Sequence, residues 1–493
     1  FQSKTDPIVQ CTAEGFFLLY NWSQKSIESF IPIPKETEFL SFQWEKHLYA
    51  YINENNLYVS SYYDLQTKYQ ISQDGSRDIV YGQSVHRDEF GIDRGTFWSP
   101  NGEFLCFYRM DQSMVTDYPL VDISTRIATT APTKYPMAGE TSHKVTVGIY
   151  DFKAQKVIYL NTGDNTDQYY AGITWNPNNK YIYLYNLNRQ QNHLKLLEFD
   201  ISTGEQTRQL YEEKNQKYIN IRRGLTFLPW DNNSFLFSSE KDGYDHLYLF
   251  NLQTLEITKI TDDKFGVVLS IVGFNKSTKS VIINCTGELE LQHNLYIISL
   301  ENLNNYQLLG NKKGSHNASL CDDGSFLVDT WSAFDVPRQI DLINTTNNEI
   351  ETLHQSPNPF QGYQLPEITT GTLESNDENK TKLHYRLIKP LNFNEQQKYP
   401  CVIYVYGGPH ARLVLNEWLY KCRGWEIFMA QRGYVVFVLD GRGSDERGFE
   451  FESVIYKQLG KHEMEDQMKG VEFLKSLCYV DADRIGISGW SYG

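Results

Sequence analysis

An aromatic strand that runs into a tight turn recurs from the start of the chain to about residue 355. The clearest copies are Phe97–Gly102 and Thr174–Asn179, which share a Trp-x-Pro-Asn core, and weaker copies begin at Phe227 and Phe274. The later copies follow at intervals of roughly 50 residues, close to the length of one propeller blade. We therefore predict an all-β propeller of seven or eight blades, because the units are too short and too regular for an array of β-sandwiches.

A second apolar strand with a Leu-Tyr pair accompanies the first in several units. It is found at Asn56–Val59, His246–Leu249 and Asn294–Ile297. The 34 Tyr and 27 Phe residues fit this interpretation, since aromatic side chains suit half-buried pleated surfaces. The interval between the first two copies is longer, and we assign the excess to an insertion at residues 110–143, where prolines interrupt any regular pattern.

After residue 360 the pattern of the chain changes from alternating to continuous apolar runs. Cys401–Tyr406 and Tyr434–Leu439 are typical of strands covered on both faces by helices. Between the last strands, Glu463–Ser476 carries apolar residues at helical spacing. We predict a parallel α/β domain over residues 361–493 behind a propeller domain over residues 1–360, with the boundary in the segment Ser356–Pro366.

Charge and cysteine content exclude several classes of function. The formal net charge of −15 repels phosphate backbones, so we expect no nucleic-acid binding. No run reaches the roughly 18 apolar residues that a membrane span needs, and Phe1 leads directly toward a strand-like run rather than a secretory signal. The 7 cysteines are scattered without a Cys-x-x-Cys pair, so we expect no zinc site and no dense disulfide framework. We expect no other metal and no cofactor.

The last residues of the chain contain a serine in a motif that is typical of a strained backbone turn. A short apolar strand leads into Gly489-Trp490-Ser491-Tyr492-Gly493, a Gly-x-Ser-x-Gly sequence. In an α/β-hydrolase domain this serine occupies a strained strand-to-helix turn, and the two glycines let neighbouring backbone pass closely. We predict that Ser491 is the nucleophile of an acyl-transfer reaction and that the backbone N–H of Tyr492 donates to the oxyanion.

A second donor to the oxyanion is expected at the end of the strand Cys401–Tyr406. Either a backbone amide or the phenol of Tyr406 fits this position, and a packed aromatic residue fits it equally well. His410 and His462 precede the serine, whereas the base follows it in this fold, so we expect both to be structural. The catalytic Asp and His are expected beyond Gly493, and the hydrolase domain is expected to be incomplete.

With these motifs in view, the chain resembles the dipeptidyl peptidase IV branch of the prolyl oligopeptidase family, especially its bacterial dipeptidyl and prolyl tripeptidyl peptidases. The resemblance rests on the segments Val405–Pro409, Asp440–Ser444, Gly489–Gly493, Phe97–Gly102 and Lys241–Tyr248. It implies a serine exopeptidase that releases N-terminal di- or tripeptides after proline. It also implies that the Tyr406 phenol serves the oxyanion, that Ser491 is the nucleophile and that Tyr492 walls the proline pocket.

The same resemblance assigns the substrate N-terminus to acidic residues just ahead of a Trp-Ser-Pro strand. The matching segment is His86–Gly91, in which Asp88 and Glu89 stand where dipeptidyl members have two glutamates. A buried ammonium group needs carboxylate partners because its desolvation is costly. Glu89 is the stronger candidate, and the choice between dipeptide and tripeptide release stays open. The alternative is a solvated loop in which Arg87 pairs with one of the acids.

The resemblance also implies an oligomeric state and a location, and two kinds of alternative function stay open. The insertion at residues 110–143 matches an arm that reaches a second subunit, which implies a homodimer acting on peptides with a free N-terminus. Relatives of this type imply a periplasmic or extracellular location. The alternatives for function are an endopeptidase or acylaminoacyl peptidase of the same architecture, or a non-catalytic propeller that binds peptides or proteins.

Overall fold

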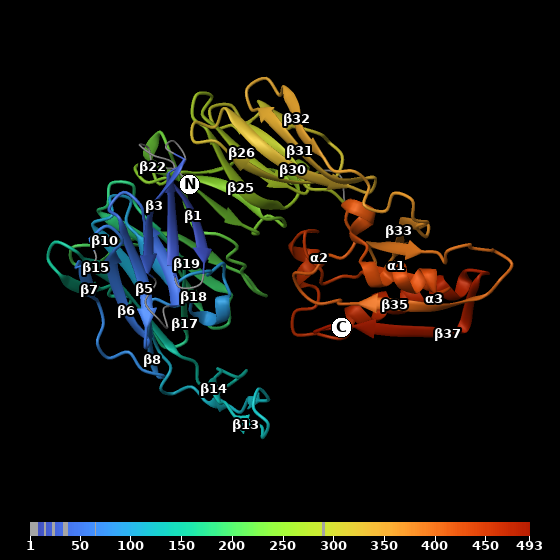
Figure 1. Cartoon of the computed structure of the whole chain (residues 1–493), viewed down its shortest axis with the longest axis horizontal. Helices are drawn as coiled ribbons and strands as arrows, with labels where there is room; N and C mark the ends of the chain where they lie inside the picture. Colours follow the sequence, from blue (N-terminus) through green and yellow to red (C-terminus); the bar gives the residue numbers. More distant parts are fainter. Residues whose placement is uncertain (1–7, 14–15, 22–24, 33–37, 65, 288–290) are drawn as a thin grey trace. The chain divides into compact units, whose positions relative to one another are not determined.

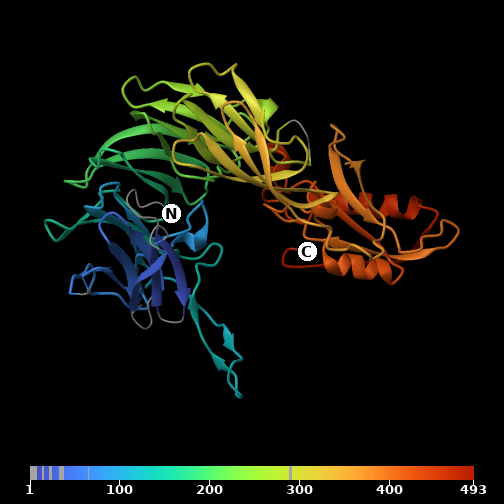
Figure 2. The same cartoon turned by 45° about the horizontal axis from the view of Figure 1, so that its top comes forward.

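The computed structural model describes residues 8–13, 16–21, 25–32, 38–64, 66–287 and 291–493. The chain forms two compact units, Phe1–Phe227 and Leu228–Gly493. Along the described residues up to Gln355, seven antiparallel sheets of three to five strands follow one another, and a mixed sheet with three helices comes after them (Figures 1 and 2). The described helices include none with the length and apolar character that a membrane crossing requires.

The first unit contains four of the antiparallel sheets. The first is built from β1 (Ile8–Ala13), β2 (Phe16–Asn21) and β3 (Ser26–Pro32). The second is built from β4 (Glu38–Gln43), β5 (Leu48–Asn53), β6 (Asn56–Ser61) and β7 (Lys68–Gln70). The third is built from β8 (Ile79–Tyr81), β9 (Thr96–Trp98), β10 (Phe104–Asp111), β15 (Lys144–Asp151) and β16 (Lys156–Tyr159). The fourth is built from β17 (Gln168–Trp175), β18 (Tyr181–Asn188), β19 (His193–Asp200) and β20 (Gln206–Lys214).

The Trp of the repeated motif links the third and fourth sheets each to the sheet before it. The indole Nε1 of Trp175, at the end of β17, donates to the carbonyl of Phe97 in the preceding sheet at 3.0 Å. The indole of Trp98, at the end of β9, donates in the same way to the carbonyl of Ser41 in β4 at 3.4 Å. A buried indole needs an acceptor for its N–H, and here the neighbouring sheet supplies it. The sequence repeat therefore marks the contacts between successive sheets of this unit.

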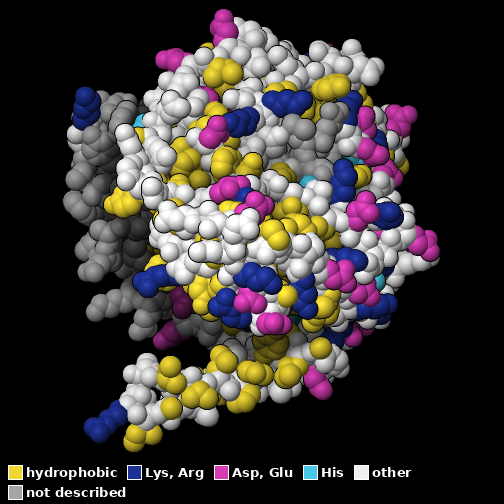
Figure 3. Space-filling model, turned by 90° about the vertical axis from the view of Figure 1, so that its right-hand side faces the viewer, with side chains coloured by type: hydrophobic (Ala, Val, Ile, Leu, Met, Phe, Trp, Pro, Cys, Tyr) yellow, Lys and Arg dark blue, Asp and Glu magenta, His cyan; other side chains and the backbone are white. Residues whose placement is uncertain are grey.

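The predicted insertion forms an arm between β10 and β15. It contains two short antiparallel pairs, β11 (Asp117–Tyr118) with β14 (Thr133–Lys134) and β12 (Val121–Asp122) with β13 (Thr129–Thr130). The prolines limit these ladders to two residues per strand, since a proline has no backbone N–H to donate. Many of its apolar side chains are exposed, and Figure 3 shows them along the extension at the bottom of the view.

Three further antiparallel sheets follow, and apart from Thr226 and Phe227 all of their residues belong to the second unit. They are built from β21 (Thr226–Leu228), β22 (Asp231–Ser239), β23 (His246–Asn251) and β24 (Ile257–Lys259); from β25 (Val268–Asn275), β26 (Ser280–Cys285), β27 (Asn294–Ser299) and β28 (Tyr306–Leu309); and from β29 (Ser315–Leu320), β30 (Phe326–Ala333), β31 (Val336–Asn344) and β32 (Ile350–Gln355). Every residue of β26 is buried, whereas every residue of β32 is exposed. Inner strands therefore provide the apolar core of each sheet, and outer strands face solvent.

The mixed sheet has the order β33–β34–β36–β35–β37. Its strands are β33 (Ile368–Glu374), β34 (Lys382–Ile388), β35 (Tyr399–Val405), β36 (Val435–Asp440) and β37 (Val480–Gly489). The prediction of a parallel sheet is correct for β35, which pairs parallel with β36 and β37, but β34 pairs antiparallel with both β33 and β36. The sequence does not reveal the antiparallel pairing of β33 and β34, because their residue pattern resembles that of the antiparallel strands before them.

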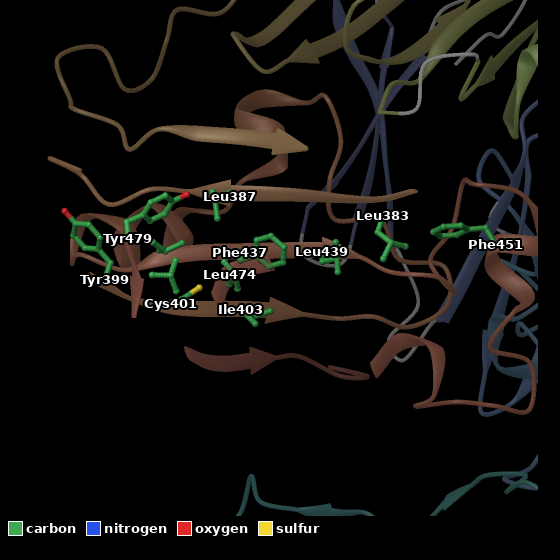
Figure 4. Close-up of a cluster of buried hydrophobic side chains, with 12 residues drawn as sticks. Leu383, Leu387, Tyr399, Cys401, Ile403, Phe437, Leu439, Phe451, Leu474 and Tyr479 are labelled. Carbon is green, nitrogen blue, oxygen red and sulfur yellow. The ribbon is translucent and has the colours of Figure 1, made fainter. Parts of the chain in front are cut away.

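Helices cover both faces of the mixed sheet. They are α1 (Gly424–Gln431), α2 (Phe449–Ser453) and α3 (His462–Ser476). Short 3-10 turns occur elsewhere in the chain at η1 (His86–Asp88) and η2 (Asp263–Phe265), and just before α1 at η3 (Trp418–Lys421). Val436 packs with Ile427 and Ala430 of α1, while the next residue, Phe437, packs with Leu474 of α3. Successive strand residues point to opposite faces, so α1 and α3 lie on opposite sides of β36. Figure 4 shows the cluster on the α3 side.

The division at residue 360 stays a prediction. The antiparallel sheets end at Gln355 and the mixed sheet begins at Ile368, while the second compact unit includes both kinds of sheet. Six described cysteines, at positions 106, 285, 321, 401, 422 and 478, are free thiols, and the side chain of Cys11 lies outside the described residues.

Candidate active site

Ser491 lies on a tight turn directly after β37. Its φ is 56°, in the left-handed region that a residue with a Cβ seldom adopts, and the turn is closed by a 3.0 Å hydrogen bond from the Gly493 N–H to the Trp490 carbonyl. Such a conformation costs roughly 1–2 kcal/mol for a residue other than glycine. The left-handed backbone at Ser491 agrees with the strained turn that the motif predicts at this position.

The two glycines of the motif are required by close backbone contacts. A Cβ at Gly489 would lie 2.3 Å from the carbonyl carbon of Gly493, and a Cβ at Gly493 would lie 2.0 Å from the carbonyl oxygen of Val405. Both distances are far below a normal contact, so only glycine fits at these positions. The turn that carries Ser491 is thereby packed against the end of β35, next to Tyr406.

Tyr406 follows β35, whose last residue pairs with Gly489 in the parallel ladder. Within the described residues the Tyr406 hydroxyl makes no hydrogen bond. Its ring centroid lies 6.4 Å from that of Tyr492. Two of the predicted oxyanion residues are therefore brought together with the nucleophile, and the phenol of Tyr406 is available as a donor.

The phenol of Tyr492 is already engaged. Its hydroxyl donates to Oε1 of Glu463 at 2.5 Å, and burial together with this carboxylate raises the pKa of Tyr492 to about 12. Glu463 belongs to the first turn of α3 and is only 7% exposed. The helical spacing of residues 463–476 predicts that Glu463 begins a helix but gives it no role, since its partner lies 29 residues away.

The two histidines near the motif have partners of their own. Nδ1 of His462 lies 3.2 Å from Oε2 of Glu465 in the same helix. Nδ1 of His410 lies 3.8 Å from Asp445 and 3.9 Å from Glu452. His410, Asp445 and Glu452 each place one possible metal-ligand atom within 4.8 Å of the other two. That neither histidine is the base stays a prediction, which rests on the order of the residues in the chain.

The segment Asp440–Ser444 organises the loops around the turn. The buried carboxyl group of Asp440 accepts hydrogen bonds from the backbone of Leu413 and Val414 at 2.8–3.0 Å, and burial raises its pKa. Arg442 donates its backbone N–H and its guanidinium to Asp466 of α3, with a shortest distance of 2.7 Å. This part of the motif therefore fixes α3 relative to β36 rather than contributing reactive groups.

The acidic segment of the first unit has an unusual backbone. His86, Arg87, Asp88 and Phe90 all have φ between 55° and 61°, so η1 is a left-handed turn. Hydrogen bonds from the backbone of Asp88 to Val85 and of Glu89 to His86 close it. A run of left-handed residues other than glycine is costly, and such strain gathers at functional sites.

Asp88 and Glu89 are exposed, and within the described residues neither forms an ion pair. Among the described residues Arg87 does not pair with either acid, because its guanidinium lies over the ring of Tyr135 at 4.9 Å. The exposure of both acids fits the solvated loop, so their role stays a prediction. Asp88 also lines a cavity of about 330 Å³. The two acids are therefore free to meet a cationic group.

His86 holds the segment in place. Its ring is buried, and Nδ1 lies 2.9 Å from Nε2 of His143. Nε2 of His86 accepts the backbone N–H of Tyr170 at 3.3 Å. Burial lowers the pKa of His143 to about 4, so both rings stay neutral near pH 7. No local sequence signal reveals this pair, since its members lie 57 residues apart.

Comparisons with known proteins cover both units. The family model of the dipeptidyl peptidase IV N-terminal region matches residues 1–338, and that of the prolyl oligopeptidase family matches residues 421–493. The probable dipeptidyl-aminopeptidase B of Phaeosphaeria nodorum is 25% identical over 92% of this chain and 53% of its own length. The chain thus spans about half the length of the curated relatives it matches.

Two solved structures are similar over nearly the whole chain. A Bacteroides ovatus protein assigned as a dipeptidyl aminopeptidase IV is 40% identical, with a TM-score of 0.91 over 99% of this chain and 70% of that one. Porphyromonas gingivalis dipeptidyl peptidase 4 is 24% identical, with a TM-score of 0.86 over 98% and 69%. These matches confirm the predicted fold class, a β-propeller followed by the N-terminal part of an α/β-hydrolase domain.

Proposed function

Because the chain belongs to the dipeptidyl peptidase IV branch of the prolyl oligopeptidase family, we propose that it carries the nucleophile and the oxyanion donors of a serine exopeptidase. The enzyme releases N-terminal dipeptides from substrates with proline at the cleavage position. The names of its relatives favour dipeptides over tripeptides. The observation that carries the proposal is the left-handed turn at Ser491, packed against the end of β35 beside Tyr406.

The reaction uses the residues of this turn in distinct roles. Ser491 Oγ attacks the carbonyl carbon of the proline residue while its proton passes to a histidine base. The Tyr406 phenol and the Tyr492 backbone N–H donate hydrogen bonds to the oxyanion that forms. When the intermediate collapses, the leaving amine takes the proton from the histidine, and water later hydrolyses the acyl-enzyme. In this fold the carboxylate and the histidine follow the serine in the chain, so we place both after Gly493.

The substrate N-terminus binds to the acidic segment of the first unit. Glu89, with Asp88 beside it, offers carboxylates that have no cationic partner among the described residues. An ammonium group in contact with them is stabilised by charge-assisted hydrogen bonds. The strained turn fixes these carboxylates on a segment closed by its own backbone bonds, which preorganises them for a ligand.

The arm supplies a surface for a second copy of the chain. Its exposed apolar side chains are Tyr118, Leu120, Val121, Ile123, Ile127, Tyr135 and Met137. Several exposed apolar side chains gathered on one projecting segment are typical of a protein–protein interface. We therefore place a homodimer contact on this arm.

The function is tested by the release of a chromophore from Gly-Pro and from Ala-Ala-Pro conjugates. The protein must include the residues that follow Gly493. Rapid release from Gly-Pro, slow release from Ala-Ala-Pro and no release by the Ser491→Ala variant are expected. Preference for an N-acylated or internal proline peptide would instead identify an acylaminoacyl peptidase or an endopeptidase. No hydrolysis of any of these substrates would identify a binding propeller.

A further inference from the structure

The carboxyl group of Glu463 is buried and accepts a hydrogen bond from a single side chain among the described residues. Its Oε1 accepts the phenol of Tyr492 at 2.5 Å, a distance typical of a bond between a hydroxyl and an ionised carboxylate. Its Oε2 is buried and has no hydrogen-bond partner among the described residues. Since a buried carboxyl group needs donors, the Tyr492 phenol and Glu463 fix one another.

Glu463 is held on a rigid support. One turn further along α3, Asp466 is fully buried and binds the backbone and guanidinium of Arg442. Next to it, Gln467 donates to the carbonyl of Leu439 at 3.1 Å. Leu474 of the same helix is buried in the core of the mixed sheet. The start of α3 therefore cannot shift without disturbing that core.

Tyr492 is confined from the opposite side as well. A Cβ at Gly408 would lie 2.8 Å from Cγ of Tyr492 and 3.0 Å from Cε1 of Tyr406. The Tyr492 ring thus lies against the backbone of Gly408 while its hydroxyl is bound to α3. Because Tyr492 directly follows Ser491, a ring fixed at both ends also restricts the backbone at the nucleophile.

We propose that Glu463 is a positioning residue, which holds Tyr492 so that its backbone N–H and its ring face the reacting carbonyl group. This inference rests on the proposed peptidase function and assigns different roles to the hydroxyl groups of Tyr406 and Tyr492. The phenol of Tyr492 is occupied by Glu463, whereas the phenol of Tyr406 is free among the described residues. The hydroxyl of Tyr406 therefore serves the oxyanion, and the hydroxyl of Tyr492 serves only to fix its own residue.

The test compares Glu463→Ala, Glu463→Gln and Tyr492→Phe in the active enzyme, with kcat and KM measured on a Gly-Pro substrate. Glu463→Ala lowers kcat/KM by up to about 100-fold, the scale of a small misplacement at a reacting group, and most of the loss is in kcat. Glu463→Gln recovers most of the activity, because its amide oxygen still accepts the phenol. Glu465→Ala, in the same helical turn, is the matched control and leaves kcat within twofold of wild type.

Double variants separate the two tyrosines. Adding Tyr492→Phe to Glu463→Ala brings little further loss, because both remove the same hydrogen bond, whereas adding Tyr406→Phe multiplies the loss. Multiplicative losses for Glu463 with Tyr492 would overturn the proposal, as would Glu463→Ala with wild-type kinetics. If the wild-type enzyme itself cleaves no Gly-Pro substrate, the proposed function fails instead.

A spectroscopic measurement reports the contact without activity. A fluorotyrosine at position 492 gives a 19F signal whose shift with pH follows the titration of the phenol. In Glu463→Ala the phenol titrates at lower pH than in the unaltered protein, while Glu465→Ala leaves it unchanged. Equal titration in all three proteins would overturn the contact, and circular dichroism confirms that each variant is folded.

Discussion

Nε2 of His293 lies 2.7 Å from Oε2 of Glu446, and the same oxygen accepts Nη1 of Arg412 at 2.7 Å. His293 directly precedes β27 of a blade-like sheet, whereas Glu446 follows β36 of the mixed sheet. The backbone N–H of Asn416 also donates to the carbonyl of Leu291 at 2.7 Å. Within the second unit, the antiparallel sheets and the mixed sheet are therefore joined by polar contacts as well as by chain connectivity.

Glu446→Gln should weaken this junction in a pH-dependent way. Burial alone would raise the pKa of Glu446, but the contacts with His293 and Arg412 lower it. A carboxyl group whose pKa is lowered by folding stabilises the protein at pH values above the pKa that it has in the unfolded chain, about 4.3. This contribution is lost as the pH falls through the lower pKa of the folded state. We expect the variant to lose about 1–3 kcal/mol at pH 7 and progressively less below pH 4.

Urea denaturation across this pH range measures the effect. Glu301→Gln, which removes an exposed carboxylate paired with Lys279, is the control and should change stability by about 0–1 kcal/mol. A loss in Glu446→Gln that is the same at every pH would show that charge plays no part at this junction.

Gly408→Ala should impair catalysis without unfolding the protein. The added methyl group would meet the first ring atom of Tyr492 at 2.8 Å, so the ring must shift. A displaced oxyanion donor costs on the order of 10- to 100-fold in kcat. Gly424→Ala is the matched control, since a Cβ there meets nothing within 4 Å. Unchanged kcat in Gly408→Ala would mean that the position of Tyr492 is not critical.

Glu89→Gln should reduce activity only on substrates with a free N-terminus. Loss of the charged partner of an ammonium group typically costs about 2–5 kcal/mol, which corresponds to roughly 30-fold or more in kcat/KM. Asp88→Asn should cost less, and Glu103→Gln, whose carboxylate binds Asn101 instead, should cost nothing measurable. Equal losses on free and N-acetylated peptides would contradict recognition of the N-terminus.

Charged substitutions on the arm should dissociate the proposed dimer. Ile123 and Ile127 are 82% and 81% exposed, so Ile123→Lys and Ile127→Glu add charge without disturbing a core. Light scattering after size exclusion should give the mass of a dimer for wild type and of a monomer for the variants. Ile350→Lys, at an exposed site of β32, should remain dimeric. A wild-type monomer, or a dimer that survives both changes, would exclude the arm as the interface.

Local signals in the sequence predict the fold and part of the site. The Trp-x-Pro-Asn repeats predict the sheets, and Trp98 and Trp175 turn out to link successive sheets. The Gly-x-Ser-x-Gly motif predicts the turn at Ser491, because the conformation and the glycines that permit it lie within five residues. These features can be recognised without knowing which distant segments come together.

The remaining features depend on contacts between distant segments. Glu463 meets Tyr492 across 29 residues, and His293 meets Glu446 across 153. The left-handed turn at residues 86–88 contains no glycine, so its backbone cannot be read from residue type. The mixed pairing of the last sheet likewise follows from how β34 docks beside β36, not from a pattern within either strand.

Covalent labelling shows directly whether Ser491 is the nucleophile of a dipeptidyl peptidase. The enzyme, including the residues after Gly493, is treated with a phosphonate ester of a dipeptide that ends in proline, and the site of attachment is identified by mass spectrometry. We expect one adduct per chain on Ser491, none in Ser491→Ala and much slower labelling by the N-acetylated reagent. Attachment to another serine such as Ser488, or no attachment at all, would contradict this role of Ser491.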